Sequence, residues 1–438
     1  MTERAVATGT ERATTGGSLI SPLRHRRFRL LWLGTSASLL GDGVYLVALA
    51  WQAYSLSPRP QALALLGVCA TVPQLLALLG GGIMSDRLER RRILLAADAV
   101  RFVAVGVVAV LVLAGQARLW HLVILSVVYG LGAGVAAPAF DAIVPDLVPA
   151  GDLEQANALE QFLRPAMLRL AGPAVGGLLI AAVGVGWGLT LDALSFLVSA
   201  GCLLQMRLAG GARARASSSA EPSLLSDALT GARYVAGQVW LWGTFASAAV
   251  AYLMFIGPTE VLLPYIVRRT LGGTAADFGL ILAAGGIGAL AAAAVVGAIG
   301  LPRRQLTFMY VTWTVATFAV AGYGLAHAGW QLMVICMLIN GLEAAGTVAW
   351  ATTKQRLVPA GLLGRVSSLD WFISIAGLPV SYALTAPAAA LFGVRATLIG
   401  AGLVGGACTL AALFLPGMRD VDGALQRPPA PAPEQQLV

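Results

Sequence analysis

Two carboxyl side chains stand in the middle of apolar segments. Asp42 lies between Gly41 and Gly43, and Glu343 lies near the centre of another apolar run. A charged side chain at mid-bilayer costs about 2.5 to 3.5 kcal/mol on insertion scales, and burial without a counter-charge favours the neutral acid. Such a group can bind and release a proton near neutral pH. The pattern therefore indicates proton binding. The structural alternative is a neutral acid hydrogen-bonded to a neighbour, such as Asn340 for Glu343.

Further charged residues lie within apolar runs. Glu260 and Asp192 are toward the outer ends of two runs, where we expect water to reach them. Asp98 and Arg101 are near an inner membrane interface and are more typical of a structural pair than of a reactive one.

The segments that carry these residues are long enough to cross a membrane, which takes about 20 residues of helix. The chain has 438 residues, of which 58% are hydrophobic and 11% charged, and its mean hydropathy is +0.79. Continuous rather than alternating apolar runs predict helices and not barrel strands. We predict twelve spans, at 28–56, 62–84, 92–114, 119–138, 157–183, 187–207, 238–267, 277–300, 305–326, 330–351, 366–392 and 396–416.

Most of the positive charges are predicted to lie on one side of the membrane. With the N-terminus inside, 24 of the 29 Lys and Arg residues fall on the cytoplasmic side and 5 on the outer side. The positive-inside rule then predicts that both termini are cytoplasmic. This placement explains the net charge of +8 better than a nucleic-acid partner does, and we expect none.

Cofactor and enzyme chemistry have little support. The 4 cysteines fall inside apolar runs without metal-type spacing, so we expect no disulfide, no metal site and no cofactor. The 3 histidines lie at interfaces, and no nucleotide-binding or hydrolase motif occurs. A membrane enzyme would need converging catalytic groups, and a sensor or scaffold would be expected to carry a substantial soluble domain.

The sequence repeats itself. The residues 147–151, LVPAG, recur at 357–361, an offset of 210, and the six span starts in each half differ by 209 to 215. An even number of spans per copy gives two parallel six-helix halves. The predicted division is a cytoplasmic tail (1–27), a first half (28–207), a cytoplasmic linker with a short amphipathic helix (208–237), a second half (238–416) and a cytoplasmic tail (417–438).

Between spans two and three the chain carries a charged motif. Gly82 is followed by Asp86 and Arg87, and then by Arg90 and Arg91. In this spacing the chain resembles the major facilitator superfamily, although Glu89 occupies the place of that motif's second glycine. The resemblance covers all twelve spans and implies a cytoplasmic latch that favours an outward-facing state. By position, we expect Asp141 to pair with Arg90, and the region of Arg365 and Asp370 to pair with Asp86.

A second motif lies in span five. Gly172, Pro173, Gly176 and Gly177 resemble the core of a motif typical of drug-exporting antiporters, although Leu168 replaces its earlier glycine. Close helix packing through small residues is the alternative reading. In span four, Val127 stands where many drug exporters of this superfamily carry an arginine. The first half looks most similar to the macrolide-efflux and enterobactin-exporter-like branch.

The resemblance also implies which helices line the cavity. Spans 1, 4, 7 and 10 do so in this superfamily, which would bring Asp42, Glu343 and Glu260 to the cavity. Aromatic residues on these spans would then form an apolar surface for a bulky substrate, with lipid contact or packing as the alternative. The residues we single out are Tyr45, Tyr252, Phe255 and Trp350.

Together these features predict an all-α membrane protein with the major facilitator fold. The predicted function is proton-coupled export of amphipathic small molecules, such as drugs, macrolide-like natural products or siderophores. The alternative is an importer or lipid-moving carrier on the same fold, and a membrane enzyme or a non-transporting sensor is a remote one. We expect a monomer in the plasma membrane, with its substrate, protons and lipid as partners.

Overall fold

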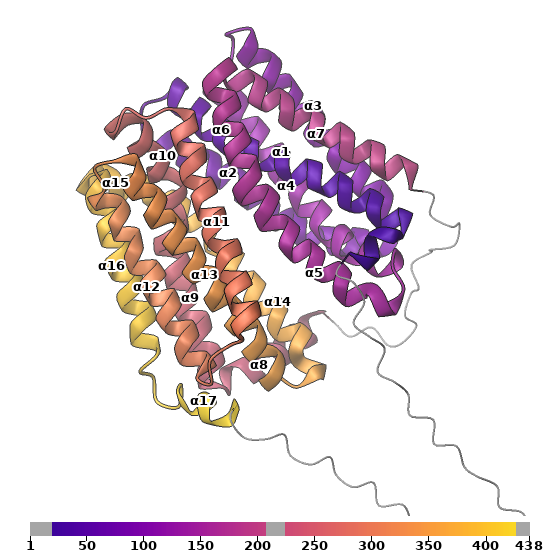
Figure 1. Ribbon diagram of the computed structural model, residues 1–438, viewed down its shortest axis with the longest axis vertical. Helices are drawn as coiled ribbons and strands as arrows, with labels where there is room; N and C mark the ends of the chain where they lie inside the picture. Colours follow the sequence, from indigo (N-terminus) through magenta and orange to yellow (C-terminus); the bar gives the residue numbers. More distant parts are fainter. Residues whose placement is uncertain (1–19, 207–223, 426–438) are drawn as a thin grey trace, which may run out of the picture.

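The computed structural model describes residues 20–206 and 224–425. Within these ranges the side chains of residues 79–87, 150, 154, 224–229, 360 and 424–425 lie outside the description. All regular elements in the described ranges are helical (Figure 1).

The first half is built from α1 (Arg26–Leu56), α2 (Pro60–Arg87), α3 (Arg90–Leu113), α4 (Leu119–Ile143), α5 (Leu153–Arg164), η4 (Pro165–Ala171), α6 (Gly172–Val183) and α7 (Val185–Gln205). The second half is built from α9 (Val239–Gly257), η5 (Pro258–Leu262), α10 (Leu263–Tyr265), η6 (Ile266–Thr270), α11 (Ala275–Ile299), α12 (Gln305–Leu325), α13 (Gly329–Leu357), α14 (Ala360–Ala376), α15 (Leu378–Phe392) and α16 (Val394–Ala412). Outside the spans lie η1 (Ser21–Arg24), η2 (Val144–Asp146), η3 (Ala150–Asp152), α8 (Leu224–Ala236) and α17 (Asp420–Leu425).

The predicted twelve spans are confirmed. Twelve helical stretches are long and apolar enough to cross a membrane. Two of them, α5–η4–α6 and α9–η5–α10–η6, contain π-helical turns that begin at Pro165 and Pro258. Proline has no backbone N–H to give to the preceding turn, so the helix locally takes a wider register.

The two halves repeat one packing scheme. In the first half α1 and α3 pack on α7, and α2 and α3 pack on α4. In the second half α9 and α12 pack on α16, and α11 and α12 pack on α13. These are the same helix pairs in repeat order, which agrees with the duplication. Contacts between the halves run mainly through α2 with α15 and through α6 and η4 with α11.

Glycines set the closest of these approaches. A Cβ placed on Gly130 would lie 2.0 Å from the Ala70 carbonyl oxygen, between α4 and α2. A Cβ on Gly288 would lie 2.1 Å from the Met337 carbonyl oxygen, at the equivalent crossing of α11 and α13. Small residues of this kind let helices meet closely in a membrane.

The two ends of the bundle differ in how the halves meet. We call the end that carries η1, α8 and α17 the terminal side, and the opposite end the distal side (Figure 1). A large apolar cluster at the distal side contains buried residues of both halves. At the terminal side each half has a separate cluster, centred on Phe28 and Ile143 in the first half and on Tyr310 and Trp350 in the second. The halves are therefore packed together at the distal side and have separate cores at the terminal side.

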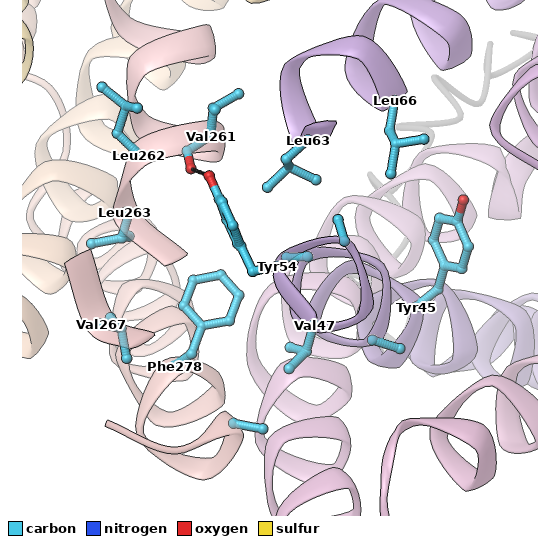
Figure 2. Packing of buried hydrophobic residues seen from close by; sticks show 14 of the residues in the cluster. Tyr45, Val47, Tyr54, Leu63, Leu66, Val261, Leu262, Leu263, Val267 and Phe278 are labelled. Carbon is cyan, nitrogen blue, oxygen red and sulfur yellow. Dashed lines mark hydrogen bonds between the residues drawn. The ribbon is translucent and has the colours of Figure 1, made fainter. Parts of the chain in front are cut away.

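The distal cluster closes around Tyr54. Its ring lies between Leu63 of α2 and residues 261–267 of the second half, and its hydroxyl donates a hydrogen bond of 2.6 Å to the Val261 carbonyl oxygen (Figure 2). Arg269 adds a hydrogen bond of 3.1 Å from its guanidinium to the Tyr54 carbonyl oxygen. This cation lies at the C-terminal end of α1, where the helix dipole favours positive charge.

Candidate functional site

A pocket opens at mid-depth in the second half, between α9, α12, α13 and α16. It holds about 530 Å³ of empty space, counted out to its open mouth. Of the described residues that line it, Glu343 alone is charged. The lining residues are Ser247, Ala248, Ala251, Tyr252, Phe255, Trp313, Ala316, Thr317, Glu343, Thr347 and Thr409.

Glu343 faces a cation from the other half. Its carboxylate lies 3.9 Å from the guanidinium of Arg169, which belongs to the π-helical segment η4. The same guanidinium donates a hydrogen bond of 2.9 Å to the Asn340 side-chain oxygen, and the Asn340 amide donates to the Cys336 carbonyl oxygen. Asn340 therefore bonds to Arg169 and Cys336, and the three side chains Arg169, Asn340 and Glu343 link the two halves at mid-depth.

Asp42 lies in a different environment, inside the first half. The Tyr129 hydroxyl of α4 donates a short hydrogen bond to its carboxylate. The Tyr129 ring stacks on Tyr45, with 4.2 Å between ring centroids. Asp42 and Tyr45 thus pack with α4 in the first half, and neither lines the pocket.

Asp98 and Arg101 form a buried ion pair beside this group. The Arg101 guanidinium donates a hydrogen bond of 2.8 Å to the Asp98 carboxylate, and both side chains are at most 10% exposed. The guanidinium also lies 4.5 Å from the centroid of the Phe196 ring and 6.0 Å from that of Tyr129. The structural reading of this pair agrees with its geometry, but it lies against the Asp42 group, which the sequence did not reveal.

Asp192 corrects a prediction. We expected water to reach it, but its residue is 0% exposed. Both carboxylate oxygens are buried without a hydrogen-bond partner. It packs against α1, where a Cβ on Gly41 would lie 2.7 Å from one of these oxygens. The first half therefore gathers Asp42, Asp98, Arg101 and Asp192 between α1, α3, α4 and α7; we call these four residues the charged cluster. The sequence showed each charge but not their convergence.

Glu260 belongs to the second half and lies apart from the pocket. It sits on the π-helical segment η5, exposed, and accepts a short hydrogen bond from the Tyr382 hydroxyl of α15. Of the three predicted proton-binding carboxylates, only Glu343 lines the pocket.

The motif between α2 and α3 is described in part. Gly82, Asp86 and Arg87 lie where the side chains are outside the described residues. Arg90 differs from our expectation. Its guanidinium contacts Asp146 at 2.6 Å and the Ala142 carbonyl oxygen at 2.8 Å, rather than Asp141.

The neighbouring Arg91 donates hydrogen bonds to the Leu203 and Leu204 carbonyl oxygens at the end of α7. Asp370, which we expected near Asp86, instead pairs with Lys354 at 2.7 Å. All these contacts lie within one half. The physical reason is that the halves have separate cores at this side, so each charge takes a partner from its own half.

The span-five motif lies at two close helix crossings. A Cβ on Gly172 would lie 2.7 Å from the Gly43 Cα in α1, and a Cβ on Gly177 would lie 2.6 Å from the Ala275 carbonyl oxygen in α11. Gly176 and Pro173 are buried beside them. The packing alternative therefore has direct geometric support, and one of the two crossings joins the halves.

Two of the four aromatic candidates line the pocket and two do not. Tyr252 and Phe255 line the pocket. Tyr45 stacks in the first half, and Trp350 is buried in the terminal-side cluster, where its indole N–H donates a hydrogen bond of 2.8 Å to Asp370. The direction in which each ring points depends on helix rotation, which the near-uniform apolarity of these spans does not reveal. Trp313, which the sequence analysis passed over, also lines the pocket.

This fold defines a multi-pass membrane protein of the major facilitator type, with two six-helix halves and a pocket within the second half. The structure of a bacterial homologue of the human lysosomal transporter Spinster, inward-facing and unoccupied, is similar to it, with a TM-score of 0.66 and 14% identity over 94% of this chain and 100% of that one. The family model described as transmembrane secretion effector matches residues 17–437. The chain therefore belongs to this family of the major facilitator superfamily.

Named relatives are distant but extensive. The chain is 30% identical to the uncharacterized MFS-type transporter y4rN of Sinorhizobium fredii, over 59% of this chain and 63% of that protein. It is 26% identical to the multidrug efflux pump Tap of Mycolicibacterium fortuitum, over 87% of this chain and 94% of Tap. It is 21% identical to macrolide efflux protein A of Streptococcus pyogenes, over 84% and 91%.

Proposed function

We propose that the chain exports amphipathic small molecules, such as drugs, macrolide-like natural products or siderophores, and couples their export to protons. The observation that carries this proposal is the pocket of the second half, where Tyr252, Phe255 and Trp313 surround one carboxylate, that of Glu343. Aromatic rings offer adaptable apolar contact area, and the carboxylate gives a polar or cationic group of the substrate a partner. Full-length relatives named as efflux pumps support the direction of transport.

Transport follows from alternating access. In this proposal the terminal side is cytoplasmic, as the positive-inside rule predicts, and the protein is a monomer in the plasma membrane. The structure then represents a state that opens to the cytoplasm, with the distal contacts of Tyr54 and Arg269 closed. Export requires these contacts to break while the terminal sides of the two halves come together.

The charged motif acts in the opposite state. When the terminal side closes, we expect the loop with Gly82, Asp86 and Arg87 to latch the halves, as the resemblance implies. Arg90 and Arg91 are then available to exchange their present partners, Asp146 and the end of α7, for partners across the interface. Asp141 remains the candidate partner of Arg90 in that state.

Protons drive the cycle through the intramembrane acids. Glu343 is the acid that substrate and proton share, because it lines the pocket. Asp42 binds a proton without touching the substrate, and Glu260 is a third candidate at the distal end of α9–η5. A proton taken up on one side and released on the other is thereby tied to the rocking of the halves.

The experiment measures export directly. Cells with and without the protein are loaded with a panel of antibiotics and siderophores, and accumulation is followed with and without a proton uncoupler. We expect lower accumulation with the protein, reversed by the uncoupler. In inverted vesicles the same compounds should accumulate inside when a pH gradient is applied.

Glu343→Gln is the matched variant, because it keeps the shape of the side chain and removes its charge. A loss of export that is strongest for cationic compounds supports the assigned pocket. Accumulation that rises in cells with the protein would instead identify an importer and refute the proposed direction.

A further inference from the structure

Asp192 is an acid that does not line the pocket. It lies on α7, is 0% exposed, and has neither carboxylate oxygen hydrogen-bonded. The nearby Ser195 hydroxyl does not satisfy it, because that hydroxyl donates to the Asp192 backbone carbonyl oxygen at 2.7 Å. A carboxyl group in this environment is unusual, because buried polar groups almost always find a partner.

Its surroundings come from three packed helices. Gly41 of α1 makes the closest packing, and the charged groups that act on Asp192 are Asp42 and Arg101. The other titratable side chains of the same region are Tyr45 on α1, Asp98 on α3 and Tyr129 on α4.

Two hydrogen-bond donors of this region, Arg101 and Tyr129, already bond to other carboxylates. Arg101 is the one cation of the charged cluster, and its guanidinium bonds to Asp98 at 2.8 Å. The Tyr129 hydroxyl donates to Asp42. Two of the three carboxylates therefore have a donor, and Asp192 has none. An ionised carboxylate in this position would pay its desolvation cost without a hydrogen bond to offset it, whereas the neutral acid pays much less.

We propose that Asp192 holds a proton in this conformation and carries it as the coupling ion of the exporter. This step rests on the proposed function and assigns its proton to a residue remote from the pocket. Release requires a partner for the carboxylate. Arg101 is suited to supply it, because its guanidinium already lies over the ring of Phe196, one turn further along α7.

A proton fits this position better than a metal cation. A sodium or divalent ion needs several oxygens converging at about 2.0 to 2.6 Å. Among the residues that the structure describes, no group of three or more acidic, histidine or cysteine side chains is placed to hold a metal ion. The packing of Asp192 against Gly41 also leaves little space beside its carboxylate.

The test compares infrared spectra of the wild type and of single variants. Each is measured on the full-length protein in lipid nanodiscs at neutral pH, without substrate. A protonated carboxylic acid has a carbonyl stretch that a carboxylate lacks. We expect this band in the wild type and its loss in Asp192→Asn, which keeps the shape of the neutral acid. Asp98→Asn is the matched control and should leave the band unchanged, because Asp98 is paired with Arg101.

If Asp192→Asn does not give folded protein, Asp192→Ser removes the carboxyl group and is smaller. A band that is as strong in the folded Asp192 variant as in the wild type, or that falls in Asp42→Asn instead, overturns the assignment. A band that appears only without sodium overturns it in favour of a sodium site.

A second measurement separates this proposal from the proposed function. Ethidium uptake into inverted vesicles is measured with and without a pH gradient. We expect the wild type to respond and the gradient-dependent part to fall about tenfold or more in the Asp192 variant. A wild type that ignores the gradient counts against proton-coupled export of this probe, while the infrared band decides the protonation of Asp192 in either case.

Discussion

The two halves use the same site for opposite purposes. In the first half α1, α3, α4 and α7 enclose the charged cluster, and in the second half the equivalent α9, α12, α13 and α16 enclose the pocket. Helix α3 begins at Arg90 and α12 at Gln305, 215 residues later, so Asp98 and Arg101 correspond to Trp313 and Ala316. Both of these second-half residues line the pocket.

The difference shows how a duplicated scaffold divides its work. In the first half, charged side chains fill the space between four helices, with Arg101 paired to Asp98, Tyr129 donating to Asp42, and Asp192 left without a partner. In the second half, aromatic and small side chains leave that space open to a ligand. Helix α11 packs on α13 of the second half and on α6 and η4 of the first. In the proposed transport cycle, a change of charge in one half would act on the tilt of the other through these contacts.

The largest effect should come from removing the only cation of the charged cluster. Arg101→Leu leaves Asp98 as an unpaired buried acid, and loss of one partner of a buried pair costs about 3 to 5 kcal/mol. We expect a large fall in the apparent melting temperature, measured by fluorescence-detected size-exclusion chromatography.

The double variant Asp98→Asn with Arg101→Gln is the control, since it replaces the ion pair by a neutral hydrogen-bonding pair. It should recover most of the lost stability. If Arg101→Leu were as stable as the wild type, the charged cluster would not be a buried network, and the contrast between the halves would fail.

A smaller effect should follow at the joint between the halves. Tyr54→Phe removes the hydroxyl that donates to the Val261 carbonyl oxygen, a hydrogen bond worth about 1 kcal/mol. The open-distal state should then gain about fivefold in population, because about 1.4 kcal/mol corresponds to tenfold. Spin labels at Gln116→Cys and His327→Cys, in a variant without the 4 native cysteines, report the distal separation.

Tyr265→Phe is a suitable comparison, because it removes a hydroxyl from a ring that packs edge-on to Tyr54. It should leave the distance distribution as it is in the wild type. An equal shift in both variants would mean that the hydrogen bond from Tyr54 to Val261 has no particular part in holding the distal side closed.

The fold could be predicted because its determinants are local. Each span can be recognised from about 20 consecutive apolar residues. The LVPAG repeat at 147–151 and 357–361 indicated that the two halves arose by duplication. The observed spans agree with the predicted ones to within a few residues, apart from the longer terminal-side ends of α4, α13 and α14. Part of the predicted linker and tail is helical, as α8 and α17, and Asp422 of α17 accepts hydrogen bonds from the start of α12.

The site was only partly predictable because it depends on helix rotation. A helix that is apolar on all sides gives no periodicity to show which residue faces its neighbour. Glu343, Tyr252 and Phe255 were expected at the cavity and line the pocket, whereas Tyr45 and Trp350 point into packed interiors. The charged cluster escaped prediction for the same reason, since its members come from different helices.

The smallest effect on stability should come from the charge of the pocket. Glu343 lies 3.9 Å from Arg169, and their side chains are 30% and 54% exposed. Water screens a pair of this kind, so Glu343→Gln should change stability by about 0.5 kcal/mol or less, even though it also lies at mid-membrane depth. Thermal melts of this variant beside Arg101→Leu therefore compare an open site with a filled one in the same molecule. A loss as large for Glu343→Gln as for Arg101→Leu would mean that the second half encloses its acid as tightly as the first, and that the pocket is not open to solvent.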